Sequence, residues 1–144
     1  MNSYPLCANH FSIEWGGKRI GASEISGLSI NLQPISYSEG TFRANAPIVM
    51  PGKQKTNTIV LKRGIMPGDN EYYDWLKSVK GNTVERRDLT ISLLNENHEP
   101  VVTWKLKNAF PVKMEWTDLN ANSNEPAMEM LEVMHEGMTV ENGA

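Results

Sequence analysis

The sequence predicts a mainly β domain with one α-helix, and three observations support this prediction. Apolar and polar residues alternate with a period of two along most of the chain, as in strands with one buried face. Gly, Pro and Asn cluster between the alternating runs, where turns are expected. One stretch, about residues 71–80, has apolar residues at helical spacing. With 144 residues, of which 40% are hydrophobic, the chain suits a single domain spanning residues 1–144.

The N-terminal third is expected to consist of strands. Residues 11–15 alternate and lead into the turn pair Gly16-Gly17, a sequence suited to positive φ. Residues 20–33 read as one long strand that bends at Gly27, with Ser29 and Asn31 opposite its apolar side chains. The alternation then continues through residues 35–38.

Residues 45–55 interrupt the alternation and are predicted to form a long loop. Pro47, Pro51 and Gly52 break the pattern, and Lys53 and Lys55 end the segment. A loop of this length favours a role in contact over simple connection, with a plain surface excursion as the alternative. A strand is expected to follow at residues 56–63.

The helix is expected to begin after Asp69 or Asn70, either of which can act as N-cap, and to end near Gly81. Its apolar face indicates packing against the core rather than a ligand site. That face consists of Tyr72, Trp75, Leu76 and Val79.

Residues 86–108 read as the central β-hairpin, with a polar turn at residues 95–99. One face is apolar, and the other carries Thr90 and Ser92 on the first strand and Thr103 and Lys105 on the second. The outer edges of an isolated hairpin leave backbone groups that need a partner strand. Residues 112–117 read as a further strand.

The last segment, residues 125–136, is the ambiguous one. Its Met, Glu and Leu residues favour a helix by local propensity, whereas an all-β context with an unpaired edge favours a strand.

Charge and composition argue against several functional classes. A net charge of −3 is too close to neutral for a protein devoted to nucleic acid. All Lys and Arg residues lie at or before Lys113, and the carboxylates after it form either a solvated acidic end or a surface for a basic partner. Cys7 is the only cysteine, so no internal disulfide can form. With no signal peptide and no stretch long enough to span a bilayer, we expect synthesis in the cytoplasm and no membrane insertion.

The motifs of catalysis are missing from the sequence. There is no nucleophile elbow and no phosphate-binding P-loop, and His10, His98 and His135 do not have metal-ligand spacing. We therefore expect no catalytic residues, no cofactor and no metal.

A series of short motifs follows in a fixed order along the chain. They are Phe11-Ser12-Ile13-Glu14-Trp15-Gly16-Gly17, Glu24-Ile25-Ser26-Gly27-Leu28, Pro51-Gly52-Lys53, Leu61-Lys62-Arg63-Gly64, Tyr73-Asp74-Trp75-Leu76, Arg86-Arg87-Asp88 and Leu93-Leu94-Asn95-Glu96, and they continue through Trp104, Pro111 and Leu131-Glu132 to His135-Glu136-Gly137. In this order the motifs resemble the tail-tube proteins of contractile phage tails and of phage-tail-like injection particles, and the resemblance covers nearly the whole chain.

This resemblance implies a β-sandwich or β-barrel with one helix, similar to the haemolysin-coregulated tube protein (Hcp) of type VI secretion. It also implies a structural subunit, rings of six copies, and rings stacked into a tube that a contracting sheath drives through an envelope. The implied partners are sheath, baseplate or spike and cap proteins, with a protein or nucleic-acid payload in the lumen. The implied location is the tail tube of a virion or injection particle, and residues 125–136 are implied to be a strand.

Combining the resemblance with the strand patterns gives candidate residues for assembly. The lumen candidates are Ser29, Asn31, Thr90, Ser92, Thr103 and Lys105. The candidates for contact between rings or subunits are Asn45, Pro47, Ile48, Val49, Met50, Pro51, Gly52, Lys53 and Lys55, with Glu115, Asp118 and Glu125 as the complementary acidic surface. The alternative is a monomeric β-sandwich that binds a partner by strand addition.

Overall fold

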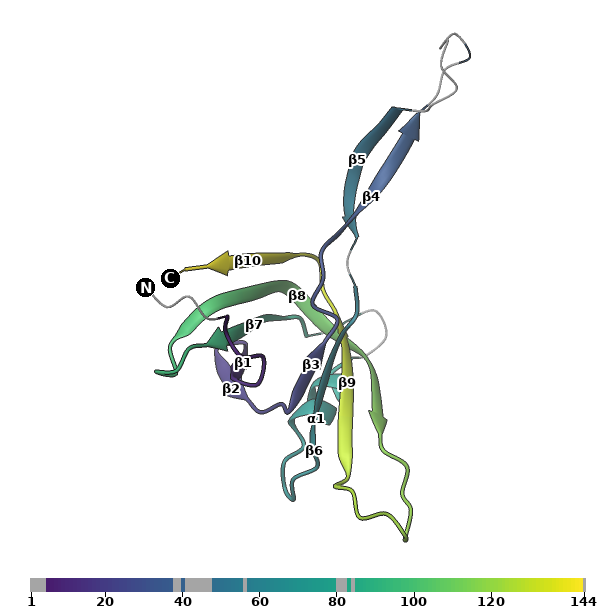
Figure 1. The fold of residues 1–144 in the computed structure, drawn as a ribbon. Helices are drawn as coiled ribbons and strands as arrows, with labels where there is room; N and C mark the ends of the chain where they lie inside the picture. The colour runs from purple at the N-terminus through teal and green to yellow at the C-terminus, as the bar shows by residue number, and fades with distance from the viewer. Residues whose placement is uncertain are drawn as a thin grey trace.

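The computed structural model describes residues 5–37, 40, 48–55, 57–79, 83 and 85–143 (Figure 1). Most of the described chain is strand, and one short helix accompanies it. The elements in chain order are β1 (Phe11–Trp15), β2 (Lys18–Ile20), β3 (Glu24–Ser26), β4 (Asn31–Tyr37), β5 (Ile48–Lys55), β6 (Ile59–Gly64), α1 (Glu71–Lys77), β7 (Arg87–Leu94), β8 (Pro100–Trp116), β9 (Met128–Met134) and β10 (Met138–Asn142).

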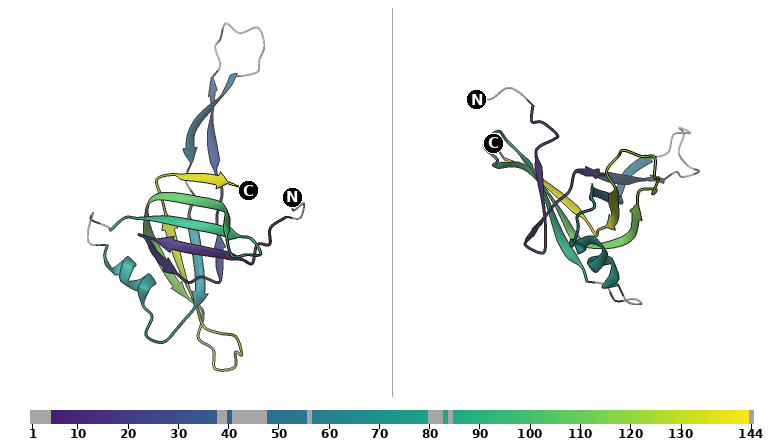
Figure 2. Two further views of the ribbon diagram at one scale, coloured as in Figure 1. Left: turned by 90° about the vertical axis from the view of Figure 1, so that its left-hand side faces the viewer. Right: turned by 90° about the horizontal axis from the view of Figure 1, so that it is seen from below.

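The 17-residue strand β8 connects two antiparallel sheets. Its N-terminal half lies between β7 and β10, which gives a first sheet in the order β2-β1-β7-β8-β10. Its C-terminal half pairs with β9, which gives a second sheet in the order β8-β9-β6-β3. The two sheets diverge from β8, as Figure 2 shows. The predicted fold class, mainly β with one helix, is confirmed, but the described strands do not close into a barrel within one chain.

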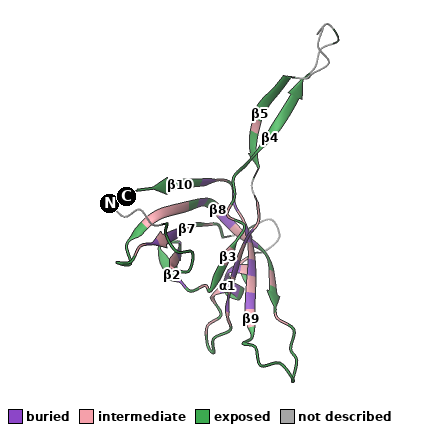
Figure 3. Cartoon of the chain, in the orientation of Figure 1, coloured by how far each residue is buried: buried purple, intermediate pink, exposed green. Residues whose placement is uncertain are grey.

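The hydrophobic core lies between the sheets and α1. Alternate residues of β1, β7 and β8 point inward from the first sheet, and Leu131 and Val133 point inward from the second. Trp15 and Trp75 pack edge to face with ring centroids 4.9 Å apart, an arrangement favoured by aromatic quadrupoles. The indole Nε1 of Trp75 donates a hydrogen bond of 2.7 Å to the carbonyl of Glu85. Buried residues therefore cluster on the body, whereas β4 and β5 are almost wholly exposed (Figure 3).

The helix ends earlier than predicted. It stops at Lys77 rather than near residue 80, because the hydroxyl of Ser78 donates to the Trp75 carbonyl and turns the chain. At the other end Asp69, not the N-cap residue Asn70, accepts a hydrogen bond from the Glu71 N–H. Tyr72 and Trp75 are buried as the helical spacing predicted. The prediction was wrong for Val79, which lies beyond the end of α1 and is exposed.

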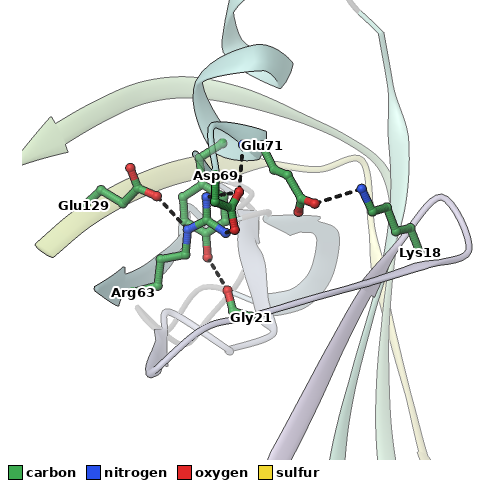
Figure 4. Close-up of polar contacts among 7 residues, drawn as sticks. Lys18, Gly21, Arg63, Asp69, Glu71 and Glu129 are labelled. Carbon is green, nitrogen blue, oxygen red and sulfur yellow. Dashed lines mark hydrogen bonds and ion pairs between the residues drawn. The ribbon is translucent and has the colours of Figure 1, made fainter. Parts of the chain in front are cut away.

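A buried ionic cluster fastens α1 to the second sheet (Figure 4). Arg63 on β6 donates to Glu129 on β9 at 2.6 Å and to both carboxylate oxygens of Asp69 at 3.1 Å. Its guanidinium also lies 3.9 Å from the ring centre of Tyr72. Burial opposes the charge of Arg63, but the hydrogen bond and charge of Glu129 outweigh it and raise the pKa of Arg63. Burial also raises the pKa of the Tyr72 hydroxyl, which donates to the Gly21 carbonyl at 3.0 Å.

One strand prediction was wrong in detail. Residues 20–33 do not form one bent strand, because the chain leaves β2 at Gly21 and leaves β3 at Gly27. Gly27 has φ of 92°, and a Cβ there would collide with the carbonyl oxygen of Thr58. The edges of the central hairpin have the partner strands that they were expected to need, since β1 pairs with β7 and β10 pairs with β8. Among the described strands, the open edges of the first sheet therefore lie at β2 and β10.

The ambiguous last segment is a strand. β9 covers Met128–Met134 within the predicted residues 125–136 and alternates between buried and half-buried residues. Strand β10 was not anticipated, because its five residues are defined by their pairing with β8.

Candidate assembly surfaces

The outer face of the first sheet, here called the polar face, is built from side chains directly opposite one another on neighbouring strands. The register places Ser12, Ser92, Thr103 and Glu141 in one row. It places Arg19, Glu14, Thr90, Lys105 and Thr139 in the next row. Because directly opposite residues share a face, these nine residues form one surface on the side away from the core.

Charges of both signs are interspersed on the polar face. Glu14 is opposite Arg19, and the Nζ atom of Lys105 lies 3.4 Å from a carboxylate oxygen of Glu141. Asp88 and Lys107 line a shallow hollow together with Thr90, Lys105 and Thr139, which brings them to the same surface. Three carboxylates thus accompany three cations, and most of the remaining positions are hydroxyls.

Four of the six lumen candidates meet on this face: Thr90, Ser92, Thr103 and Lys105. Ser92 is only 9% exposed, because this short side chain lies between the opposing residues Ser12 and Thr103 in the middle of the sheet. Ser29 and Asn31 are not brought to it, since Ser29 lies in the segment before β4 and Asn31 begins β4, outside the first sheet. The sequence did not predict that residues of β1, β2 and β10 also belong to the polar face. Alternation was visible at residues 11–15, but nothing local showed which strand pairs with which.

The predicted loop at residues 45–55 is a strand over its second part. Ile48–Lys55 is β5, which pairs with β4 in a separate two-stranded ribbon (Figure 1). Pro51 is accommodated because a strand paired on one side needs only some of its N–H groups. Gly52 is required for close approach, since a Cβ there would collide with the carbonyl oxygen of Gln33. The other candidates, Asn45 and Pro47, lie outside the described residues.

The ribbon presents large apolar side chains to solvent. Ile35 is opposite Met50 and Tyr37 is opposite Ile48, so these four residues share one side, here called the apolar side of the ribbon. They are 44–51% exposed. Val49, 63% exposed, points to the other side, where it is opposite Ser36. A contiguous exposed apolar surface of this kind is typical of interaction sites.

Lys53 and Lys55 lie at the base of the ribbon, because Lys55 is opposite the first residue of β4. Two acidic candidates, Asp118 and Glu125, are in the exposed β8–β9 connection. The ribbon and this connection extend from opposite ends of the body (Figures 1 and 2). The third acidic candidate, Glu115, already has a partner within the chain, Lys113, at 2.6 Å.

The histidines do not form a metal site. Within the described ranges, no group of three or more His, Cys, Asp or Glu side chains is placed to hold a metal ion. Nε2 of His10 lies 2.7 Å from Nδ1 of His98, and both side chains are near the surface. His135 is buried; its Nδ1 accepts a hydrogen bond from the Gly137 N–H, and burial lowers its pKa. The described helix is also too short to cross a bilayer.

Comparison with known proteins identifies the family. The model of the T4-like virus tail tube protein gp19 matches residues 7–139. The chain belongs to this tail-tube family. No curated protein is a significant match.

Solved structures agree with this assignment to the tail-tube family. A chain of the PVC sheath–tube complex, an extracellular contractile injection system in its extended state, is 32% identical with a TM-score of 0.89; the match covers 97% of this chain and 93% of that one. A chain of the anti-feeding prophage cap is 33% identical with a TM-score of 0.91, over 99% of this chain and 95% of that one. Hcp1 from Flavobacterium johnsoniae shares the fold at 18% identity, with a TM-score of 0.54 over 93% and 96% of the two chains.

The tail-tube subunit is therefore a structural protein of a contractile tail or injection particle, as the sequence motifs implied. The family model and the similar structures are tube proteins rather than enzymes.

Proposed function

We propose that this tail-tube subunit forms rings of six copies, that the rings stack into a hollow tube, and that the polar face lines its channel. One observation carries the proposal: the β4–β5 ribbon stands away from the body and exposes its apolar side. A lone two-stranded ribbon is marginally stable in water, so a neighbouring copy is the natural cover for it.

The open edges of the first sheet provide the contact within a ring. β2 and β10 are the outer strands of this sheet, and each pairs on one side only among the described strands. Joining the β10 edge of one copy to the β2 edge of the next continues the sheet and removes both edges. A head-to-tail interface of this kind closes into a ring when its rotation permits.

Stacking uses the two ends of the molecule. The ribbon of one copy reaches a copy in the adjacent ring, and Lys53 and Lys55 face the acidic connection that carries Asp118 and Glu125. Exposed ion pairs contribute about 0–1 kcal/mol each, so they set register and polarity. The apolar side contributes more, because fully burying one such side chain is worth about 1.5–3 kcal/mol and these are about half exposed.

Paired substitutions on the two sides of the ribbon test the stacking proposal. Ile48→Ser with Met50→Ser removes half of the apolar side and should leave rings that do not stack in negative-stain electron microscopy. Val49→Ser, on the other side, should still give tubes. Full-length tubes from the double variant would refute this role for the ribbon. A wild-type subunit that stays monomeric at high micromolar concentration would refute ring formation itself and favour a binding module.

Charge reversal tests the register. Lys53→Glu with Lys55→Glu should shorten the tubes, most strongly at low salt, because exposed charges are screened as salt rises. Combining it with Asp118→Lys and Glu125→Lys should restore tube length if the two surfaces meet. If the quadruple variant does not recover tube length, Asp118 and Glu125 are not the partners of Lys53 and Lys55.

Cysteine labelling tests the channel wall. With Cys7 replaced by Ser, single cysteines at Thr90 and Thr103 should react with a bulky thiol reagent in free subunits and be shielded in assembled tubes. A cysteine at Ser26, an exposed position on β3 in the second sheet, serves as a comparison position outside the polar face. Equal labelling of the Thr90 and Thr103 positions in free subunits and in tubes would show that the polar face does not line the channel.

The similar structures support specific partners. One comes from a sheath–tube complex and another from a tube-terminating cap, so we infer a sheath around this tube and a cap at its end. A baseplate with its spike would begin the tube, and the channel would carry the payload. The subunit would be made in the bacterial cytoplasm and end in the tube of the particle.

A further inference from the structure

We infer that exposed apolar residues at the end of the body opposite the ribbon pack against the apolar side of the ribbon of a copy in the adjacent ring; this inference rests on the proposed stacking of rings. Four large apolar residues lie at that end, and they are here called the apolar end. Ile65 and Met66 follow β6, and they are 42% and 61% exposed. Trp116 ends β8 and Leu119 lies in the β8–β9 connection, and they are 51% and 90% exposed.

The apolar end is built from two loops that backbone hydrogen bonds hold together. The Ile65 N–H donates to the Ala127 carbonyl at 3.0 Å, which ties the β6–α1 loop to the residue before β9. The Thr117 N–H donates to the Met128 carbonyl at 3.0 Å, which closes the base of the β8–β9 connection beside it. Single exposed apolar residues are common on soluble proteins, but several at one end of a molecule are typical of an interaction site.

Leu119 is the most exposed of the four residues, and an ordered turn follows it. It is the only large apolar residue among residues 117–125. The Ser123 N–H donates to the Asn120 carbonyl and the Asn122 N–H donates to Oδ1 of Asn120, both at 3.0 Å. A loop that is already ordered loses less conformational entropy when it binds, so Leu119 is suited to act as an anchor in an interface.

The ribbon of a second copy is the occupant that the geometry and the charges favour. The apolar side of the ribbon and the apolar end lie at opposite ends of the body, so a head-to-tail contact between them repeats along a stack (Figures 1 and 2). Asp118 is adjacent to Leu119 in the sequence. Lys53 is three residues from Met50, which is about 10 Å along a strand. One docking arrangement therefore brings apolar surface to apolar surface and carboxylate to lysine.

This contact makes the two ends of a tube different. One end ring leaves its ribbons unpaired, and the other leaves its apolar ends unpaired. A protein that binds the first ring must present an exposed apolar anchor with carboxylates beside it. A protein that binds the second ring must present a pair of strands with an apolar side and lysines at their base. The proposed cap and baseplate would each fit one end of the tube only.

Cross-linking between copies tests the contact directly. With Cys7 replaced by Ser, Met50→Cys combined with Leu119→Cys places one cysteine on each surface. A short bismaleimide should join assembled tubes into covalent ladders and leave dispersed subunits monomeric, because the two positions lie at opposite ends of one body. The control combines Met50→Cys with Val112→Cys, a 43% exposed position on β8 outside the apolar end, and should give no ladder. Tubes in which the Met50 and Leu119 positions do not cross-link would refute the inference and leave the stacking proposal standing.

A single substitution measures how much the anchor contributes. Leu119→Ser should raise the subunit concentration needed for tube formation at least about tenfold, because burial of this side chain is lost at every ring junction. The urea midpoint of dispersed subunits should not change, since Leu119 is 90% exposed in the subunit. Val112→Ser should stay within about twofold of the wild type. Equal effects of these two substitutions would show that Leu119 is not an anchor. Wild-type rings that form no tubes at any concentration would instead overturn the stacking proposal, and this inference with it.

Discussion

Replacing Glu129 by Gln should destabilise the subunit far more than the same replacement at Glu141. Both glutamates form an ion pair with a cation on a neighbouring strand. The side chains of Arg63 and Glu129 are 7% and 6% exposed, whereas those of Lys105 and Glu141 are 54% and 67% exposed. The two substitutions are thus matched in chemistry and differ in burial.

The expected size of the effect follows from what remains around Arg63. Removing one partner of a buried pair costs about 3–5 kcal/mol, because the other charge stays buried and uncompensated. Asp69 still holds one side of the guanidinium through two bonds of 3.1 Å, which places the expected loss at about 3 kcal/mol. For a chain of this length, that lowers the melting temperature by roughly 6–12 °C. The exposed pair should contribute at most about 1 kcal/mol.

Urea unfolding of dispersed subunits, followed by tryptophan fluorescence, measures the difference, since Trp15 and Trp75 lie in the core beside the cluster. Protein concentration must be equal in all samples, because assembly adds stability by mass action. Arg63→Met combined with Glu129→Leu should recover most of the loss, because an apolar pair replaces a buried ionic pair at little cost. Similar losses for Glu129→Gln and Glu141→Gln would refute the view that burial makes this cluster important for stability.

Two further predictions concern pH and backbone conformation. The pKa of His135 is lowered by burial, so the unfolded chain binds the proton more readily and stability falls as pH drops through the ordinary value of 6.5 toward the lowered value. His135→Asn keeps an acceptor for the Gly137 N–H and should remove that part of the pH dependence of stability between pH 7.5 and 5.5. The change in urea midpoint over this range measures it, and an unchanged pH dependence would rule out His135 as its source. Gly27→Ala should lower the unfolding free energy by about 1–3 kcal/mol or more, because Gly27 has a positive φ and an added Cβ would collide with Thr58. Gly21→Ala is the control: its added Cβ meets open space, so it should change the unfolding free energy by less than about 0.5 kcal/mol. Equal effects of the two glycine substitutions would show that the bend at Gly27 relaxes.

Local patterns predicted the elements that are stabilised locally. The alternation in residues 86–108 placed β7 and the first half of β8, and its buried face includes Leu89, Ile91 and Leu106 as expected. The spacing of Tyr72 and Trp75 placed α1 and its buried side. For the hairpin and for these two helical residues, side-chain periodicity and burial agree, so neighbours in the sequence carry enough information to place the elements.

The remaining elements depend on distant partners. Residues 128–134 favour a helix by composition, yet they form a strand because β6 and β8 pair with both edges of the segment. Glu129 is buried there because Arg63, 66 positions earlier, neutralises it. β10 is defined by its pairing with β8, and no signal in its own five residues identified it. The polar face was only partly predicted for the same reason, since its rows depend on strand order.

The β4–β5 ribbon is the element that the sequence of one chain explains least. Pro51 and Gly52 indicate a loop by local rules. β4 and β5 do not contribute to the hydrophobic core, because their residues are almost all exposed. Their alternation nevertheless places Ile35, Tyr37, Ile48 and Met50 on one side, a pattern that stabilises a structure only when something covers it. If that cover is a neighbouring copy, the free energy that orders the ribbon comes from assembly and not from folding of the subunit. Substitutions on the apolar side of the ribbon should then change tube formation while leaving the urea midpoint of dispersed subunits nearly unchanged, the reverse of what Glu129→Gln should do.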